Sequence, residues 1–522
     1  MILNPVQTLD QLRQENARLL ALIEQRECTI QNLQHQLHLF RTARFGRKSE
    51  KGVVPEQMAL HFDEAACLVE LEQDVETPET QTITYTRAKK NTGRKPLPHS
   101  LPYVEQVHDL TEDEKQCACG CALTHIRDEI TEQLDVVPQM TFRVVHIRKQ
   151  YACKGCEETM KLAPMPKQPI PRSIASPGLI AAVINSKFRC HMPLYRQEEM
   201  FNAAGVPLTR GTLGHWVIKA ADLLTPLVKL MEDNIQSYDI AYADETTLQV
   251  LKEKGRLAAQ KSYMWLFAGG PPSRRAFVYQ YHQTRAHQIP TDFFADFQGY
   301  LHADCYQAYI SLGLKPSIVH VACWAHARRY FVDVAKSTKK SGLAHQVIAL
   351  IAKLYHLEAT LKEENASPVI VFAARTQKAK AIVFEIKTIL DEACSKVLPQ
   401  SPLGKAVFYA LNHWEALKAY LYDGRLDIDN NLSERAIKTF VIGRKNWLFS
   451  GNEVGAHAGA ILFSLIETCK YHQIDVFSWL KYTLTHIQQA HTLEQLERLL
   501  PYNIDNQLLD NMRSLPNLIL PA

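Results

Sequence analysis

The sequence predicts a multidomain α/β protein, in which an N-terminal coiled coil, a zinc ribbon and a helix-turn-helix region precede a core of mixed strands and helices. Three observations predict this class. Apolar residues repeat at heptad spacing near the start, cysteines cluster in two groups, and short apolar runs alternate with turn residues from about residue 236 onward. At 522 residues the chain is too long for a single core, so we expect roughly three or four domains.

Composition and charge are typical of a globular protein. Hydrophobic residues make up 46% of the chain, and no apolar run approaches the ~20 residues that a membrane-spanning helix requires. We therefore expect no membrane partner. Because the first residues carry no positively charged segment of a secretory signal, we expect a cytoplasmic protein. Basic clusters flank an acidic stretch at residues 62–80, an alternation typical of a solvated linker, which we assign to residues 46–100.

Residues 1–45 contain a heptad seam. Its apolar positions are Leu9, Leu12, Leu19, Ile23, Ile30, Leu33, Leu37 and Phe40. Asn16 occupies an interior a-type position, where a polar residue commonly fixes register and strand number. We expect a coiled coil that makes the protein a homodimer or a larger oligomer. A single amphipathic helix packed on its own domain would show the same spacing.

Residues 101–165 are predicted to bind zinc. Cys153 and Cys156 form a C-x-x-C pair with glycine in the turn, and the first group holds Cys117, Cys119 and Cys121. In a reducing compartment such clustering favours a metal over disulfides, and four thiolates complete the tetrahedral shell of a structural Zn²⁺. We expect Cys119 to be a ligand, whereas the spacing leaves open whether Cys117 or Cys121 joins it.

Residues 166–235 have the outline of a helix-turn-helix. A short helix from Leu194 is expected to end at Gly205, and Thr209 is expected to cap a second helix that begins at Arg210. The second helix of such a pair can enter the major groove of double-stranded DNA, so Arg210 is a candidate DNA contact. Any compact pair of helices would also fit this pattern.

Residues 236–485 are predicted to form one α/β domain. Short apolar runs predict strands at 238–243, 263–268, 276–281, 300–303 and 318–322. Helical patterns follow at 324–337 and over much of 343–420, and we expect a helical insertion at about 338–425. Residues 486–522 are assigned to a C-terminal tail segment.

Three carboxylates suit a site for two Mg²⁺ ions, or Mn²⁺. Asp244 and Asp304 each lie at or near the end of an apolar strand, and Glu434 lies in a segment with helical periodicity. Carboxylates that converge in this way can hold a pair of metal ions that activate water or a hydroxyl against a phosphodiester. The sequence therefore predicts a metal-dependent enzyme that acts on nucleic acid.

Each acid also has a structural interpretation. The two aspartates could form turns, and Glu245 competes with Asp244 as the metal ligand. The run Asn431-Leu-Ser-Glu434 fits a helix capping box, which would engage the glutamate with backbone N–H groups. In that case Asp427 or Asp429 would be the next candidate for the third acid.

Several longer motifs add to these patterns. They are Phe45-Gly-Arg-Lys-Ser-Glu-Lys51, Pro193-Leu-Tyr-Arg-Gln197, Asp244-Glu-Thr246, Cys323-Trp-Ala-His-Ala-Arg-Arg-Tyr-Phe331, Ile428-Asp-Asn-Asn-Leu-Ser-Glu-Arg435 and Ile442-Gly-Arg-Lys-Asn-Trp-Leu-Phe449. With them the chain resembles, over nearly its whole length, the large transposase of the insertion sequence 66 family of bacterial DDE transposases. The resemblance implies a ribonuclease H-like catalytic core with Asp244, Asp304 and Glu434 as the acids. It also implies small accessory transposition proteins as partners. The crowded first cysteine group departs from the C-x-x-C-G more usual in that family.

A C-x-x-H pair, Cys323 and His326, follows the last predicted strand. It resembles a signature of several cut-and-paste transposase groups, and the sequence shows no second pair of ligands that would complete a zinc site. His326 is a candidate hydrogen-bond donor or proton shuttle near the scissile strand, and packing is the alternative role. Guanidinium forks suit phosphate oxygens. The candidate phosphate contacts are Arg328, Arg329, Arg435, Arg444 and Lys445.

The expected function is metal-dependent DNA strand cleavage and transfer at the ends of a mobile element. Water would attack a phosphodiester to free a 3′-hydroxyl, which would then attack target DNA by direct transesterification. The alternatives are a non-catalytic DNA-binding derivative and a structure-specific nuclease on the ribonuclease H-like fold. The three retained acids argue against the first, and the zinc ribbon and coiled coil argue against the second.

Overall fold

The computed structural model describes residues 165–337 and 342–513, parts of 141–162, and single positions between residues 19 and 33. The chain divides into two compact units, residues 62–147 and the rest of the chain. The linker at 46–100 and the predicted zinc ligands Cys117, Cys119, Cys121, Cys153 and Cys156 lie outside the described residues. A short antiparallel pair, β1 (Gln150–Ala152) and β2 (Met160–Leu162), precedes the main body.

The described positions of the N-terminal heptad seam are helical. Leu19, Ile23, Ile30 and Leu33 expose between 47% and 59% of their surface. An apolar stripe that stays exposed on a single chain is available for another surface to cover.

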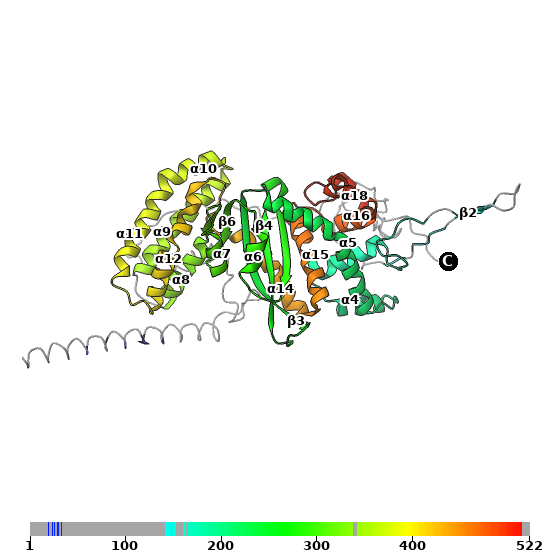
Figure 1. Cartoon of the computed structure of the whole chain (residues 1–522), viewed down its shortest axis with the longest axis horizontal. Coiled ribbons are helices and arrows are strands. Elements are labelled where there is room, and N and C mark those ends of the chain that lie inside the picture. Colours follow the sequence, from blue (N-terminus) through cyan, green and yellow to red (C-terminus); the bar gives the residue numbers. More distant parts are fainter. Residues whose placement is uncertain are drawn as a thin grey trace, which may run out of the picture. The chain divides into compact units, whose positions relative to one another are not determined.

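A mixed sheet forms the centre of the main body (Figure 1). Its order is β5-β4-β3-β6-β7, with β8 paired to the far end of β3. The strands are β3 (Ile240–Lys252), β4 (Lys261–Gly269), β5 (Ala276–His282), β6 (Gly299–Ala303), β7 (Ile318–Ala322) and β8 (Ser450–Asn452). The first three pair antiparallel, whereas β6 runs parallel to β3 and β7 parallel to β6. All five predicted strand runs are therefore confirmed as strands.

The expectation that Asp244 ends its strand is wrong, because β3 continues to Lys252. A hairpin with β4 pairs residues as far as Gln249 with Lys261, and its β-branched residues Thr246 and Thr247 suit the extended backbone. The parallel neighbour β6 ends at Ala303, however, so one edge of β3 loses that partner near the aspartate.

The helix α15 (Glu453–Tyr471) covers the edge strand β5. The backbone N–H of Phe277 donates to Thr468 Oγ1 at 3.1 Å, and that of Tyr279 donates to Ser464 Oγ at 2.8 Å. Both hydroxyls are buried. The two backbone N–H groups of this edge strand are therefore hydrogen-bonded inside the protein and cannot pair with a strand of another chain.

The predicted helix pair is present upstream of the sheet. α4 (Leu194–Ala203) is followed by Gly205 at φ +76°, and Thr209 Oγ1 caps α5 (Arg210–Gln236) by accepting the N–H of Thr212 at 3.2 Å. These caps confirm the expected boundaries. α5 continues over 27 residues and packs on α15, β5 and β4, so its inner face belongs to the same core as the sheet.

A group of helices fills the interval between β7 and α14 (Asn431–Trp447). They are α8 (Trp324–Ser337), α9 (Leu343–Glu363), α10 (Pro368–Ala374), η4 (Arg375–Ala379), α11 (Lys380–Cys394), α12 (Pro402–Asn412), α13 (Trp414–Lys418) and η5 (Ala419–Tyr422). The buried Arg375 pairs with Glu358 at 2.7 Å and donates to the carbonyls of Tyr420 and Leu426. It thereby holds the segment through which the chain returns to the sheet.

The remaining helices flank these elements. They are α3 (Pro177–Ile184), η2 (Asn185–Arg189), η3 (Pro272–Arg274), α6 (Gln288–Phe293), α7 (Gln307–Leu312), α16 (Val476–His486), η6 (Ile487–Gln489), α17 (Leu493–Glu497) and α18 (Asn506–Arg513). In the segment assigned as a tail, Leu499 is buried and its carbonyl accepts the Trp479 indole N–H at 3.0 Å. Among the helices of the described ranges, none has both the length and the apolar character to cross a bilayer.

Candidate active site

Parallel pairing brings three predicted residues to one edge of the sheet. Tyr242 on β3 lies opposite His302 on β6, so two residues further along Asp244 comes level with Asp304. Continuing the pairing of β6 with β7 brings Cys323 level with Asp304 in turn. The carboxyl ends of β6 and β7 and the middle of β3 therefore present two carboxylates and a thiol side by side.

Glu434 reaches this edge in the first turn of α14. Three hydrogen bonds fix the segment that precedes it. The side-chain amide of Asn430 donates to the Ala243 carbonyl at 3.0 Å, its backbone N–H donates to Cys323 Sγ at 3.3 Å, and the backbone N–H of Trp324 donates to the Ile428 carbonyl at 3.2 Å. The start of α14 is thus fastened to β3 and to the end of β7, and Glu434 is 2% exposed.

The capping-box interpretation of Glu434 is wrong. Asn430 is the N-cap residue of α14, and its side chain makes no capping hydrogen bond. The Glu434 carboxylate contacts Cys323 and His326 and not the backbone N–H groups at the start of the helix. The next candidates for the third acid, Asp427 and Asp429, are engaged in other hydrogen bonds. Asp427 accepts the hydroxyl of Tyr242 at 2.6 Å, and Asp429 accepts the side-chain and backbone N–H groups of Asn431.

The three predicted acids share an electrostatic environment. Burial is the main cause that raises the pKa of Asp244 well above its usual range, followed by the negative charges of Glu245, Glu434 and Asp304. Burial likewise raises the pKa of Asp304, and that of Glu434 to about 8. Carboxylates that disfavour one another's ionisation in a buried place favour a cation among them.

Glu245, the residue after Asp244, makes hydrogen bonds within the fold. Successive side chains of a strand point to opposite faces, so Glu245 and Asp244 diverge. The Glu245 carboxylate accepts Arg285 Nε at 2.7 Å and the Tyr309 hydroxyl at 2.6 Å. Arg285 in turn lies over the ring of Tyr306 at 3.8 Å. Both oxygens of Glu245 are therefore occupied within the fold.

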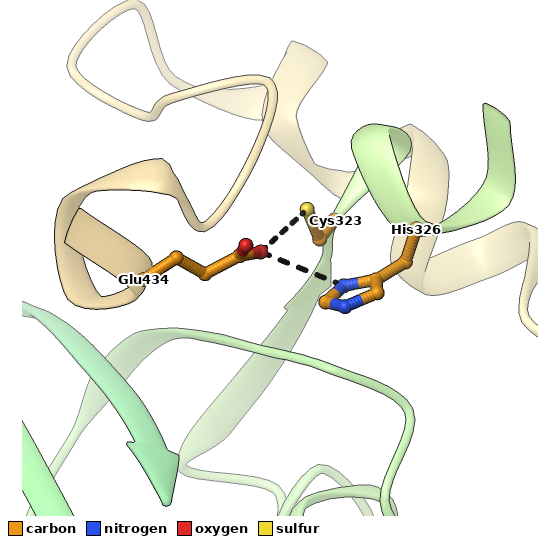
Figure 2. A group of neighbouring side chains, drawn as sticks. All are labelled: Cys323, His326 and Glu434. Atoms are coloured by element: carbon orange, nitrogen blue, oxygen red, sulfur yellow. Dashed lines mark hydrogen bonds and ion pairs between the residues drawn. The ribbon is translucent and has the colours of Figure 1, made fainter. Parts of the chain in front are cut away.

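Cys323, His326 and Glu434 form a compact group of unlike ligand types (Figure 2). Glu434 Oε1 lies 3.7 Å from Cys323 Sγ and 3.7 Å from His326 Nδ1. His326 lies in the first turn of α8, which begins directly after Cys323. Burial and then the charge of Arg329 lower the pKa of His326 to about 4, so its ring is neutral near pH 7.

The predicted phosphate contacts on α14 divide into two kinds. Arg435 and Lys445 are exposed. Arg444 is half-buried and donates to the carbonyl of Thr247, and also to the Thr247 hydroxyl at 3.0 Å. Arg444 therefore fastens α14 to β3, which the sequence alone did not indicate.

The remaining predicted contacts lie on other helices. Arg328 and Arg329 are half-buried on α8, and the charge of Arg329 lowers the pKa of Glu434 against the effect of burial. Arg210 is exposed at the first position of α5. Arg329 thus lies within electrostatic reach of Glu434, whereas Arg210 belongs to the helix pair.

Comparison with known proteins agrees with these motifs. The model of the transposase IS66 family matches residues 172–458, which span the sheet, all three acids and the intervening helices. The chain belongs to the IS66 transposase family. The IS66 C-terminal element matches residues 464–502. Membership supports a transposase that binds DNA.

Two further matches cover the N-terminal part of this IS66-family chain. The zinc-finger binding domain of transposase IS66 matches residues 114–157, which supports a structural zinc ion in the predicted cysteine region. A model described as Transposase C of IS166 homeodomain matches residues 32–105 and provides the leucine-zipper-like region.

Three relatives from Sinorhizobium fredii align over most of the chain. The uncharacterized protein y4jD is 34% identical over 78% of this chain and 81% of its own length. The uncharacterized protein y4qI is 30% identical over 94% of this chain and 92% of its own. The uncharacterized protein y4hP is 28% identical over 88% of this chain and 86% of its own length. The similarity thus extends over most of the length of each relative.

Sequence reasoning missed two structural contributors to this IS66-type site. Asn430 belongs to the motif that begins at Ile428, but the motif does not indicate that its side-chain amide joins the start of α14 to β3. Arg285 was not singled out, because it lies in a turn after β5 and is recognisable only through its contact with Glu245. No local spacing in the sequence signals either role.

Proposed function

We propose that this chain is a metal-dependent DDE transposase, which binds the ends of its mobile element, cleaves DNA strands there and joins them to target DNA. The observation that carries the proposal is the common register of Asp244 and Asp304, with Glu434 close enough to raise the pKa of Asp244. Three acids from distant parts of the chain meet at one edge of one sheet. Such convergence is what two-metal phosphodiester chemistry requires.

The strand order supports a ribonuclease H-like core. Three antiparallel strands, β3 to β5, are followed by β6 and β7, which run parallel to β3. The helices from α9 to η5 separate the second acid from the third, as a helical insertion would. We retain the domain boundaries inferred from the sequence as part of this proposal.

The acids fit a pair of Mg²⁺ or Mn²⁺ ions. Their oxygens are the ligands that hard divalent cations prefer, and Glu434 Oε2 is buried without a hydrogen-bond partner. Bound there, such ions would lower the pKa of a water molecule and stabilise charge on the phosphodiester oxygens.

The protein's own groups orient the acids. Asp244 Oδ1 accepts the N–H of Glu245 at 2.8 Å, and Asp304 Oδ1 accepts the N–H of Tyr306 at 2.9 Å. One oxygen of each aspartate is thereby held in place and the other is left for a ligand. Water attacks the phosphodiester at the element end, and the freed 3′-hydroxyl then attacks target DNA. No protein side chain becomes covalently attached to DNA in this scheme.

The proposed partners are double-stranded DNA, at both the element ends and the target, and a second copy of the chain. The exposed helical stripe of Leu19, Ile23, Ile30 and Leu33 supports self-association through the N-terminal seam. Exposed Arg435, Lys445 and Arg210 supply positive charge for phosphate contacts. Small accessory transposition proteins complete the proposed assembly.

Single amide substitutions test the proposal. Asp244→Asn, Asp304→Asn and Glu434→Gln should each abolish release of a 3′-hydroxyl from an element-end duplex and its joining to target DNA. An amide keeps the shape of the side chain but is a much poorer ligand for Mg²⁺. Asp296→Asn, which changes an exposed acid on the same domain, is the matched control and should cleave normally.

DNA binding should survive in all three variants or tighten, because a negative charge near phosphates has been removed. A gel-shift titration with the same duplex measures this. Normal cleavage by any one of the three variants would remove that residue from the proposed set.

A further inference from the structure

The geometry of Cys323, His326 and Glu434 matches the shell of one small cation (Figure 2). One ligand atom from each residue lies within 4.8 Å of the other two, and the two contacts to Glu434 Oε1 both measure 3.7 Å. Bonds of about 2.0–2.3 Å to Zn²⁺ at tetrahedral angles separate neighbouring ligand atoms by roughly 3.3–3.8 Å. The three side chains therefore need little movement to share one ion.

Two polar atoms of this group are left without hydrogen bonds. His326 Nδ1 and Glu434 Oε2 are both buried and unpartnered, and Glu434 is only 2% exposed. A buried polar atom without a partner costs free energy, so its persistence points to a ligand. The contact of His326 Nδ1 with Glu434 Oε1, at 3.7 Å, is too long to serve as that hydrogen bond.

Backbone N–H groups surround the sulfur of Cys323, which is 1% exposed. It accepts the backbone N–H of Asn430 at 3.3 Å and is also hydrogen-bonded by the backbone of His326. Backbone N–H groups around a cysteine sulfur orient it and stabilise a metal thiolate. A thiolate, a carboxylate and a neutral imidazole together carry two negative charges, which suits a divalent cation.

We propose that Cys323, His326 and Glu434 form a binding site for a thiophilic divalent ion of the Zn²⁺ class. Sulfur and nitrogen ligands select such ions over Mg²⁺, which prefers oxygen alone. Three protein ligands leave the fourth position open, as in catalytic rather than structural zinc sites. The site deepens the proposed function, because Glu434 is the third acid of that proposal.

The soft site of Cys323, His326 and Glu434 shares its glutamate with the proposed Mg²⁺ or Mn²⁺ pair. Glu434 Oε1 faces Cys323 and His326, whereas Oε2 is buried without a hydrogen-bond partner and is left for the hard ions beside Asp244 and Asp304. This soft site is separate from the zinc-finger region at residues 114–157.

Metal content of the full chain tests the inference. Protein purified without chelator should carry about two Zn²⁺ per chain, one in the zinc finger and one at the soft site, as measured by elemental analysis. Cys323→Ser and His326→Gln should each lower the content to about one. Cys469→Ser is the matched control, because Cys469 is an equally buried free cysteine in α15, and it should keep both ions.

Cobalt substitution gives an independent readout. Co²⁺ bound to a thiolate absorbs in the near ultraviolet, and the difference spectrum between wild type and Cys323→Ser should show one such thiolate. Cys153→Ser removes a zinc-finger ligand and should leave that difference unchanged. Circular dichroism checks that each variant is folded. If Cys323→Ser does not fold, His326→Gln and Glu434→Gln, which keep the thiol, must lower Zn²⁺ affinity at least tenfold.

Unchanged Zn²⁺ content in folded His326→Gln and Cys323→Ser would overturn the inference. The proposed transposase function would survive that result if Asp244→Asn and Asp304→Asn still abolished cleavage. If those two variants cleaved normally while the soft site lost its ion as expected, the metal site would stand and the proposed function would fall.

Discussion

Asp244 and Asp304 are sixty positions apart in the chain and yet level with each other on two parallel strands, since each lies two residues beyond the register pair of Tyr242 and His302. A slip of one residue in this pairing would turn one of the two side chains to the opposite face of the sheet. The site therefore depends on strand register as much as on the identity of the acids.

Glu245→Gln should leave strand cleavage within a few-fold of wild type, in contrast with Asp244→Asn. Both Glu245 oxygens are engaged by Arg285 and Tyr309, so they are not available to a metal ion. The free energy of unfolding should fall by about 1–2 kcal/mol, because a charged partner of Arg285 is lost from a largely buried position. Chemical denaturation and a cleavage assay on the same preparations measure the two effects. Loss of cleavage without loss of stability would make Glu245 a catalytic acid.

Divalent-ion affinity should rise with pH up to about 8. Burial, first among the causes, raises the pKa of Glu434 to about 8, so below that pH a proton competes with the ion for this carboxylate. Displacing one proton tightens binding by up to about tenfold per pH unit. Mn²⁺ titration followed by calorimetry between pH 6 and 9 measures the slope, and Glu434→Gln should flatten it.

The raised pKa of Glu434 also predicts how the stability of the metal-free protein changes with pH. A carboxyl with a raised pKa holds its proton more tightly in the folded state, so its contribution to stability is complete below its ordinary, unfolded-state pKa of 4.5. That contribution is lost as the pH rises through about 8. Glu434→Gln should therefore lose less stability than wild type over this window. An equal or steeper loss in the variant would show that Glu434 is ordinarily ionised.

Asn430→Ala should impair cleavage without touching a metal ligand. Its side-chain amide joins the start of α14 to the Ala243 carbonyl, directly before Asp244. Removing this buried hydrogen bond should cost about 1–3 kcal/mol of stability. A resulting displacement of Glu434 should slow cleavage on the order of 10–100-fold. Asn503→Ala removes an exposed amide hydrogen bond to Glu497 and serves as the control, with cleavage unchanged.

Alanine substitutions of the adjacent residues Lys445 and Arg444 should differ in their effect on stability. Lys445 is exposed, so Lys445→Ala should weaken DNA binding and reduce its logarithmic salt slope by about one, with stability unchanged. Arg444 donates to Thr247 on β3, so Arg444→Ala should also lower the melting temperature. Fluorescence anisotropy at several salt concentrations, combined with thermal melting, distinguishes them. If Arg444→Ala reduced the salt slope with no thermal effect, its contact with β3 would be dispensable.

Local sequence patterns predicted many of the helix boundaries and strands, because the interactions that define them act between residues close in the chain. Thr209 and Gly205 mark helix boundaries through the chemistry of a hydroxyl cap and a left-handed backbone, both of which act within a few residues. The five apolar strand runs were likewise recognisable, because each strand carries its own burial pattern. The end of β3 was misjudged, since its polar second half is held by pairing with β4 and β8.

Local spacing and composition establish the residue types of the site, its family and the order of its strands and helices. How those residues meet depends on long-range packing, which no local pattern contains. Parallel register placed Asp304 level with Asp244, and the docking of α14 turned Glu434 from a possible helix cap into a neighbour of Cys323 and His326. Such contacts join positions sixty or more residues apart, so their geometry is set by packing of the whole fold and leaves no periodicity in the chain.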